Sequence, residues 1–145
     1  MHPELELLTR LLVAAALGGL LGWERERARK AAGFRTHMLV AIGAALYTSI
    51  GELALAGVPP EADAFNADPI RAIQAVAIGI GFLGSGVIFV SRHEDRVQGL
   101  TTAASVWATA AIGIAAGQKH YILGAGATIL LLVVLRVLGR FDVED

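Results

Sequence analysis

Long apolar stretches make up most of this chain, and polar residues gather between them. Charged residues are absent from Ala72 through Val90, close to the ~20 apolar residues that a helix needs to cross the hydrocarbon core of a bilayer. Four other stretches have a similar length and character. The predicted membrane-spanning helices are residues 5–23, 38–57, 70–90, 100–117 and 121–138. The pattern predicts an all-α integral membrane protein, a bundle of five transmembrane helices in a single domain over residues 1–145.

Composition supports this interpretation. Of 145 residues, 55% are hydrophobic and 17% charged, and the mean hydropathy of +0.62 fits a chain that lies mostly in lipid. The net charge of −1 argues against a nucleic-acid partner, which needs a basic surface. Because there is no cysteine, disulfides, thiolate nucleophiles and cysteine-bound metals are excluded.

Lysine and arginine are distributed unevenly between the two predicted sides of the membrane. Nine of them lie in residues 24–37, in residues 91–99 and near the carboxyl end, which five spans place on one side. The other side has only Arg10, Arg71 and Lys119. Since cytoplasmic loops keep the positive charge, we expect the amino terminus outside and the carboxyl terminus in the cytoplasm.

The third predicted span contains the spacing Gly79-x-Gly81-x-x-Gly84, which resembles a dinucleotide-binding turn. That turn needs a preceding strand and an acidic residue about 20 positions later, and neither is present. We therefore interpret the small residues as a surface for close helix packing. They are Gly79, Gly81, Gly84, Ser85 and Gly86. The alternative is an interrupted helix whose freed carbonyls bind an ion.

The stretch GWERERARKAAGFRTH, residues 22–37, carries most of the predicted cytoplasmic charge. Glu24 with Arg27, and Glu26 with Arg29, have the i, i+3 spacing of helix ion pairs, so one interpretation is a topology anchor on acidic head groups. The other is a cytoplasmic site. Its candidate residues are Glu24, Arg25, Glu26, Arg35, Thr36 and His37. The two glutamates point about 200° apart on a helix and suit a shared metal ion poorly, and the identity of any metal stays open.

Polar residues also follow faces of the third and fourth predicted spans, and they form a candidate polar path. Its residues are Asp68, Arg71, Gln74, Thr101, Thr102 and Ser105. One interpretation is an entry path for a ligand, because polar groups in a membrane usually face protein or water. The other is structural: Arg71 pairs with Asp68 or Glu52, and the hydroxyls bond their own helix. Thr36 and Thr102 could also cap helices whose positive ends suit an anion.

Motifs for catalysis are absent. The sequence has no nucleophile elbow, no zinc-protease helix and no phosphate-binding loop, so we expect neither an enzyme nor a cofactor. An enzyme acting on lipids would have to rely on Glu24, Glu26 and His37, and this is the weakest hypothesis.

The chain resembles the MgtC/SapB family of bacterial inner-membrane proteins. The resemblance rests on GLLGWERE (19–26), AGFRTHMLVAIGAAL (32–46), DPIRAIQAVAIGIGFLGSGVIF (68–89) and VQGLTTAASVWATAAIGIAAG (97–117). It implies a membrane domain of about five spans in the inner (plasma) membrane and a link to growth at low magnesium. Many members also carry a carboxyl-terminal ACT-like domain; this chain stops at Asp145, so we expect that domain's function to be absent. Gln98 stands where an arginine is usual, and Ser85 where an alanine is usual.

Two functional hypotheses follow. The first is a non-enzymatic protein of the lipid bilayer, linked to magnesium homeostasis, that forms homo-oligomers or regulates another membrane protein complex. This hypothesis is based on the small-residue face of the third span. The alternative is a small transporter or channel for magnesium or an anion, lined by the candidate polar path.

Overall fold

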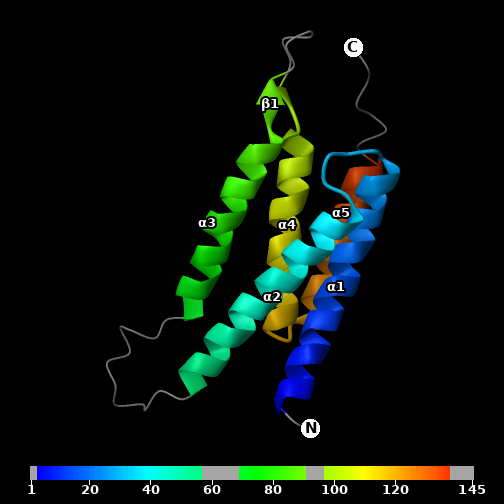
Figure 1. The fold of residues 1–145 in the computed structure, drawn as a ribbon. Coiled ribbons are helices and arrows are strands. Elements are labelled where there is room, and N and C mark those ends of the chain that lie inside the picture. Colours follow the sequence, from blue (N-terminus) through cyan, green and yellow to red (C-terminus); the bar gives the residue numbers. More distant parts are fainter. Residues whose placement is uncertain (1–2, 57–68, 91–96, 138–145) are drawn as a thin grey trace.

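The computed structural model describes residues 3–56, 69–90 and 97–137. Over these residues the chain forms five α-helices that lie side by side along a common direction (Figure 1). They are α1 (Pro3–Arg27), α2 (Phe34–Ala56), α3 (Pro69–Val87), α4 (Leu100–Gly117) and α5 (Tyr121–Val137). Helices α1 to α4 are long and apolar enough to cross a membrane, whereas α5 is a shorter apolar helix. The predicted all-α bundle is confirmed.

The connection between the first two helices is much shorter than predicted. Helix α1 continues past Trp23 to Arg27, and α2 already begins at Phe34. Basic residues in the last turn of α1 favour this extension, because they interact well with the negative end of the helix dipole. The first backbone N–H of α2, that of Phe34, donates to Oε2 of Glu26 at 2.8 Å. The predicted cap at Thr36 is therefore wrong, and Thr36 lies inside the first turn of α2.

The third helix is unbroken from Pro69 to Val87 despite its glycines, so the alternative of an interrupted helix is wrong. It ends earlier than predicted. Two short strands follow, β1 (Phe89–Val90) and β2 (Val97–Gln98), paired antiparallel. Gly99 then begins α4 with a φ of 87°, in the left-handed region that glycine adopts without strain. No side chain caps this end of α4, so the predicted cap at Thr102 is also wrong.

Close packing unites α1, α2 and α4. Gly18 of α1 lies so near α2 that a Cβ there would be 2.7 Å from the carbonyl oxygen of His37. Gly113 of α4 similarly meets the backbone of Ala41 in α2. Alanines fill the space between these helices, including Ala14, Ala41, Ala45 and Ala116. Because lipid provides no hydrophobic drive between helices, this close approach of small residues is what packs them.

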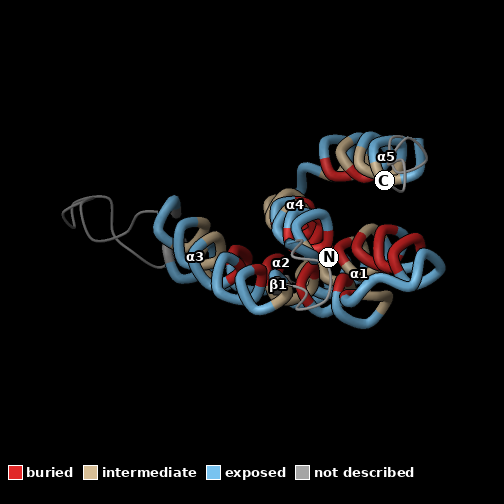
Figure 2. The backbone as a smooth tube through the Cα atoms, turned by 90° about the horizontal axis from the view of Figure 1, so that it is seen from above, coloured by how far each residue is buried: buried red, intermediate tan, exposed pale blue. Residues whose placement is uncertain are grey.

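Helix α3 is much more exposed. Figure 2 shows it at one side of the bundle, mostly in the colour of exposed residues. Gly84 packs near Ala103 of α4, but a Cβ on Gly79, Gly81 or Gly86 would meet nothing within 4 Å. Among the described residues, therefore, one of the four predicted packing glycines of α3 contacts a neighbouring helix, and the other three do not. Ser85 is exposed, and its hydroxyl donates to the carbonyl of Phe82 in its own helix.

Candidate functional site

A polar junction of buried residues from α1, α2 and α4 lies at the end of the bundle that carries the α1–α2 connection. We define it by five buried residues: Glu24, Arg25, His37, Thr102 and Ser105. His37 is fully buried, with Nδ1 2.9 Å from the carbonyl oxygen of Gly33 and Nε2 3.2 Å from Oγ of Ser105. The histidine thus connects the start of α2 to α4.

The hydrogen bonds of the junction place a hydrogen on Nδ1 of His37 but leave two acceptors for the hydrogen of Ser105. A carbonyl oxygen only accepts, so Nδ1 of His37 carries a hydrogen. Oγ of Ser105 lies 2.8 Å from the carbonyl oxygen of Thr102, and its single hydrogen can be donated either there or to Nε2 of His37. All three contacts are satisfied together only when Nε2 also carries a hydrogen, that is, when the ring is positively charged. The Ser105 hydroxyl is therefore coupled to the charge of His37.

Glu24 and Arg25 form the charged part of the junction. Nε of Arg25 donates to Oε2 of Glu24 at 2.5 Å and Nη2 donates to Oε1 at 2.8 Å. Both side chains are at least nine-tenths buried, and both charges act on the His37 ring. A two-point contact of this kind satisfies most of what each ion loses on leaving water. The predicted pairs of Glu24 with Arg27, and of Glu26 with Arg29, are wrong: Glu24 pairs with its neighbour, and Glu26 binds the backbone of Phe34.

A second polar group, which we call the arginine clamp, lies at the opposite end of the same three helices. Nη1 of Arg10 in α1 donates to Oε2 of Glu52 in α2 at 2.5 Å and to the carbonyl oxygen of Gly117 in α4 at 2.8 Å. Arg10 also pairs with Glu6 at 3.2 Å, as the i, i+4 spacing indicates. Lys119 bonds to Glu6 as well. A cation at the carbonyl end of α4 is favoured by the helix dipole.

Of the arginine clamp, only the pair of Glu6 with Arg10 is predicted by its spacing in the sequence; the contacts of Arg10 with Glu52 and Gly117 were not predicted. The structural interpretation of the polar path allowed Arg71 to pair with Glu52, but Glu52 pairs with Arg10. The available signal was the unusual depth of Arg10, two turns inside an apolar helix. The Nε of Arg10 is buried and has no hydrogen-bond partner among the described residues. In the clamp, therefore, Nη1 and Nη2 of the Arg10 guanidinium are hydrogen-bonded to described residues and Nε is not.

The predicted site residues separate into buried and exposed groups. Of the site predicted in residues 22–37, Glu24, Arg25 and His37 enter the junction, Glu26 binds the start of α2, and Arg35 and Thr36 are exposed. Of the polar path, Thr102 and Ser105 enter the same junction, whereas Arg71, Gln74 and Thr101 are exposed. Asp68 lies outside the described residues. The structure thus brings together parts of two motifs that were predicted separately.

The chemistry available to the junction is limited by its burial. A serine beside a histidine is the arrangement of an activated nucleophile, but Ser105 is only 5% exposed and His37 is not exposed at all. Within the described ranges, no three histidine or carboxylate residues are grouped so that they could hold a metal ion. The arrangement is suited to fixing three helices relative to one another.

The helices and their buried charges define a multi-helix membrane protein. Consistent with this class, a family model described as the MgtC family matches residues 11–143. This chain belongs to the MgtC family.

Several relatives support this membership. The chain is 40% identical over 132 residues to the "Putative magnesium transporter YhiD" of Escherichia coli K12, covering 91% of this chain and 60% of the relative. It is 38% identical over 121 residues to the "Protein MgtC" of Brucella abortus strain 2308, covering 83% of this chain and 46% of that protein. The "Protein SrpB" of Synechococcus elongatus is 39% identical over 136 residues, with 87% and 71% covered. The chain thus spans less than two thirds of the first two, and no solved structure matches it significantly.

Proposed function

We propose that this chain is a non-enzymatic protein of a bacterial inner membrane that contributes to magnesium homeostasis by associating through α3. The magnesium link is supported by family membership and by the name of the YhiD relative. The mode of action is supported by one observation: α3 has a membrane-length apolar surface of which little is covered within the chain. The partner that fits this surface is first a second copy of the chain, and next another membrane complex.

The contrast between α3 and the other helices supports an association role. The hydrogen bonds of the polar junction tie α2 to α4, those of the arginine clamp tie α1 to α2 and α4, and α3 takes part in neither. Large side chains such as Ile78 and Phe82 project from α3, with 76% and 81% of their surface exposed. Gly79 and Gly81 between them leave the helix backbone open. Close association of helices in lipid requires large side chains beside glycines whose backbone a partner helix can approach.

A groove beside α3 extends this surface. It has a volume of about 460 Å³ and runs between α2 and α3. Gly43 and Tyr47 line it from α2, and Gly79 and Leu83 line it from α3. None of the described residues in its lining is charged, so it suits an apolar side chain from a neighbouring helix.

The test compares two glycines that are equally open within the chain. Gly81→Leu in α3 and Gly126→Leu in α5 both place a side chain where a Cβ meets nothing within 4 Å. At both positions, therefore, the first atom of the new side chain meets open space among the described residues. We expect Gly81→Leu to weaken self-association by about tenfold, which corresponds to a loss of about 1.4 kcal/mol, and Gly126→Leu to leave it unchanged. Energy transfer between differently labelled copies in liposomes measures the change.

An unchanged association in Gly81→Leu would count against the α3 surface. Equal losses in both variants would point to a general effect of bulk in lipid. If the wild-type copies show no energy transfer at any density, self-association itself is wrong.

Transport is a second candidate, favoured by the name of the YhiD relative. Within the described residues the junction and the clamp lie at opposite ends, and Thr109 between them bonds its own helix. The exposed Arg71, Gln74 and Thr101 therefore suit a path between copies better than a path inside one chain. Magnesium flux into proteoliposomes that is insensitive to Gln74→Leu and to Thr101→Val would remove these residues from any such path.

A further inference from the structure

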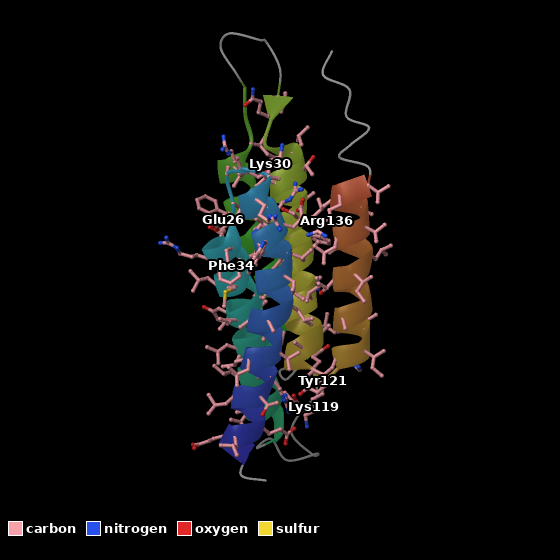
Figure 3. All side chains as sticks on the ribbon, turned by 90° about the vertical axis from the view of Figure 1, so that its right-hand side faces the viewer. Glu26, Lys30, Phe34, Lys119, Tyr121 and Arg136 are labelled. Carbon is pink, nitrogen blue, oxygen red and sulfur yellow. The ribbon has the colours of Figure 1, made fainter. Side chains whose placement is uncertain are left out.

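A pocket with an aromatic wall opens where α1 ends and α2 begins. It has a volume of about 380 Å³ and is lined by Trp23, Glu26, Arg27 and Phe34. The rings of Trp23 and Phe34 meet edge to face, with centroids 6.4 Å apart and planes at 84°. Figure 3 shows Glu26 and Phe34 toward the same end of the bundle as Lys30 and Arg136. The pocket thus combines an apolar wall with a cation at one end of the molecule.

The net charge around the pocket is positive because Glu24 is neutralised by Arg25 and the exposed cations outnumber the remaining carboxylate, Glu26. Glu24 is held by Arg25 inside the polar junction. Glu26 accepts the backbone N–H of Phe34, beside Gly33. Four exposed cations remain on this connection, and none has an ion pair in the part of the chain that the structure describes. They are Arg27, Arg29, Lys30 and Arg35.

The position of the pocket along α1 places it at the membrane surface. Trp23 is 57% exposed near the end of an apolar helix, where tryptophan marks the boundary between hydrocarbon and head groups. Exposed apolar residues continue from it toward the middle of α1 at helical spacing, namely Leu20, Ala16 and Leu12. A molecule bound at Trp23 therefore has a continuous apolar track below it.

We propose that this pocket binds one anionic glycerophospholipid. Arg27 pairs with the phosphodiester, Trp23 and Phe34 contact the glycerol and the first methylenes, and one acyl chain follows Leu20 and Leu12 along α1. A zwitterionic lipid would bring its own cation to an already positive rim. A free phosphate would contact neither the rings of Trp23 and Phe34 nor the exposed apolar residues of α1. The proposal is independent of the association through α3.

Tryptophan fluorescence tests the site because the chain has only two tryptophans. In a Trp107→Phe chain, Trp23 alone reports contact with lipids whose acyl chains carry bromine, which quenches it. We expect brominated phosphatidylglycerol to compete for the position beside Trp23 about fivefold better than brominated phosphatidylcholine, the effect of one added arginine–lipid contact. Arg27→Gln should remove the preference. Arg136→Gln, which removes a cation from the same end of the bundle, should retain it.

The converse chain, Trp23→Phe, reports from Trp107 in the middle of α4 and should show no preference between the two lipids. Three results would overturn the proposal. These are equal quenching of Trp23 by both lipids, a preference that survives Arg27→Gln, or the same preference at Trp107. Competition by inorganic phosphate that abolishes the preference would assign the pocket to a free anion instead.

Discussion

Ser105 lies where a buried hydrogen bond joins α2 to α4. Its hydroxyl is shared between Nε2 of His37 and the carbonyl of Thr102. The carbonyl of Gly33, which accepts from Nδ1 of His37, also accepts the backbone N–H of the same residue at 3.2 Å. Removing the His37 ring thus leaves Gly33 bonded, so the interaction between the two side chains can be measured cleanly.

We expect Ser105→Ala and His37→Leu to be coupled by about 0.5–1.5 kcal/mol in the free energy of unfolding, the range of interhelical hydrogen bonds in membranes. Reversible unfolding in mixed micelles measures the four proteins of the cycle. The matched control is Ser85→Ala, because the Ser85 hydroxyl is exposed and bonds only Phe82 of its own helix. It should show no coupling to His37→Leu. A coupling near zero for Ser105 would mean that the junction contact does not stabilise the fold.

At the scale of the element, all five helices could be predicted, and so could both ends of α4, but the ends of α1, α2 and α3 were placed wrongly. Apolar length alone identified α1 to α5, because a helix must satisfy its own backbone in lipid. The end of α1 was misplaced because Glu24 and Arg25 count as polar. In the structure they neutralise each other and are buried. Adjacent residues on a helix do not normally face each other, so no spacing rule indicates this pair.

The packing surfaces also show which features could be predicted from the sequence and which could not. The density of glycines predicted a packing surface on α3, yet close helix contacts are made by Gly18 and Gly113, which lie among alanines in α1 and α4. Whether a glycine meets a neighbour depends on how the helices are placed relative to one another. For the same reason the polar stripe of α4 was predictable, but not that Ser105 would meet His37. The exposed glycines of α3 remain a prediction about contacts between chains.

Across the whole molecule, the junction and the clamp divide the chain into a fixed part and a peripheral part. The junction links α2 to α4 at one end of the bundle, and the clamp links α1 to α2 and α4 at the other. Helices α3 and α5 pack against this unit from outside it (Figure 2). A partner that binds α3 can therefore do so without breaking a buried ion pair, whereas one that separates α1 from α2 must expose Arg10 or Arg25.

Orientation decides which leaflet the lipid pocket faces, and the chain allows a direct test because it has no cysteine. Lys30 lies at one end of the bundle and the α4–α5 turn at the other, as Lys119 and Tyr121 show in Figure 3. We expect His120→Cys to react with a membrane-impermeant maleimide in intact spheroplasts, and Lys30→Cys to react only after permeabilisation, because the exposed arginines beside Lys30 favour the cytoplasm. The opposite pattern would reverse the orientation, placing the arginine clamp in the cytoplasmic half and the pocket in the outer leaflet.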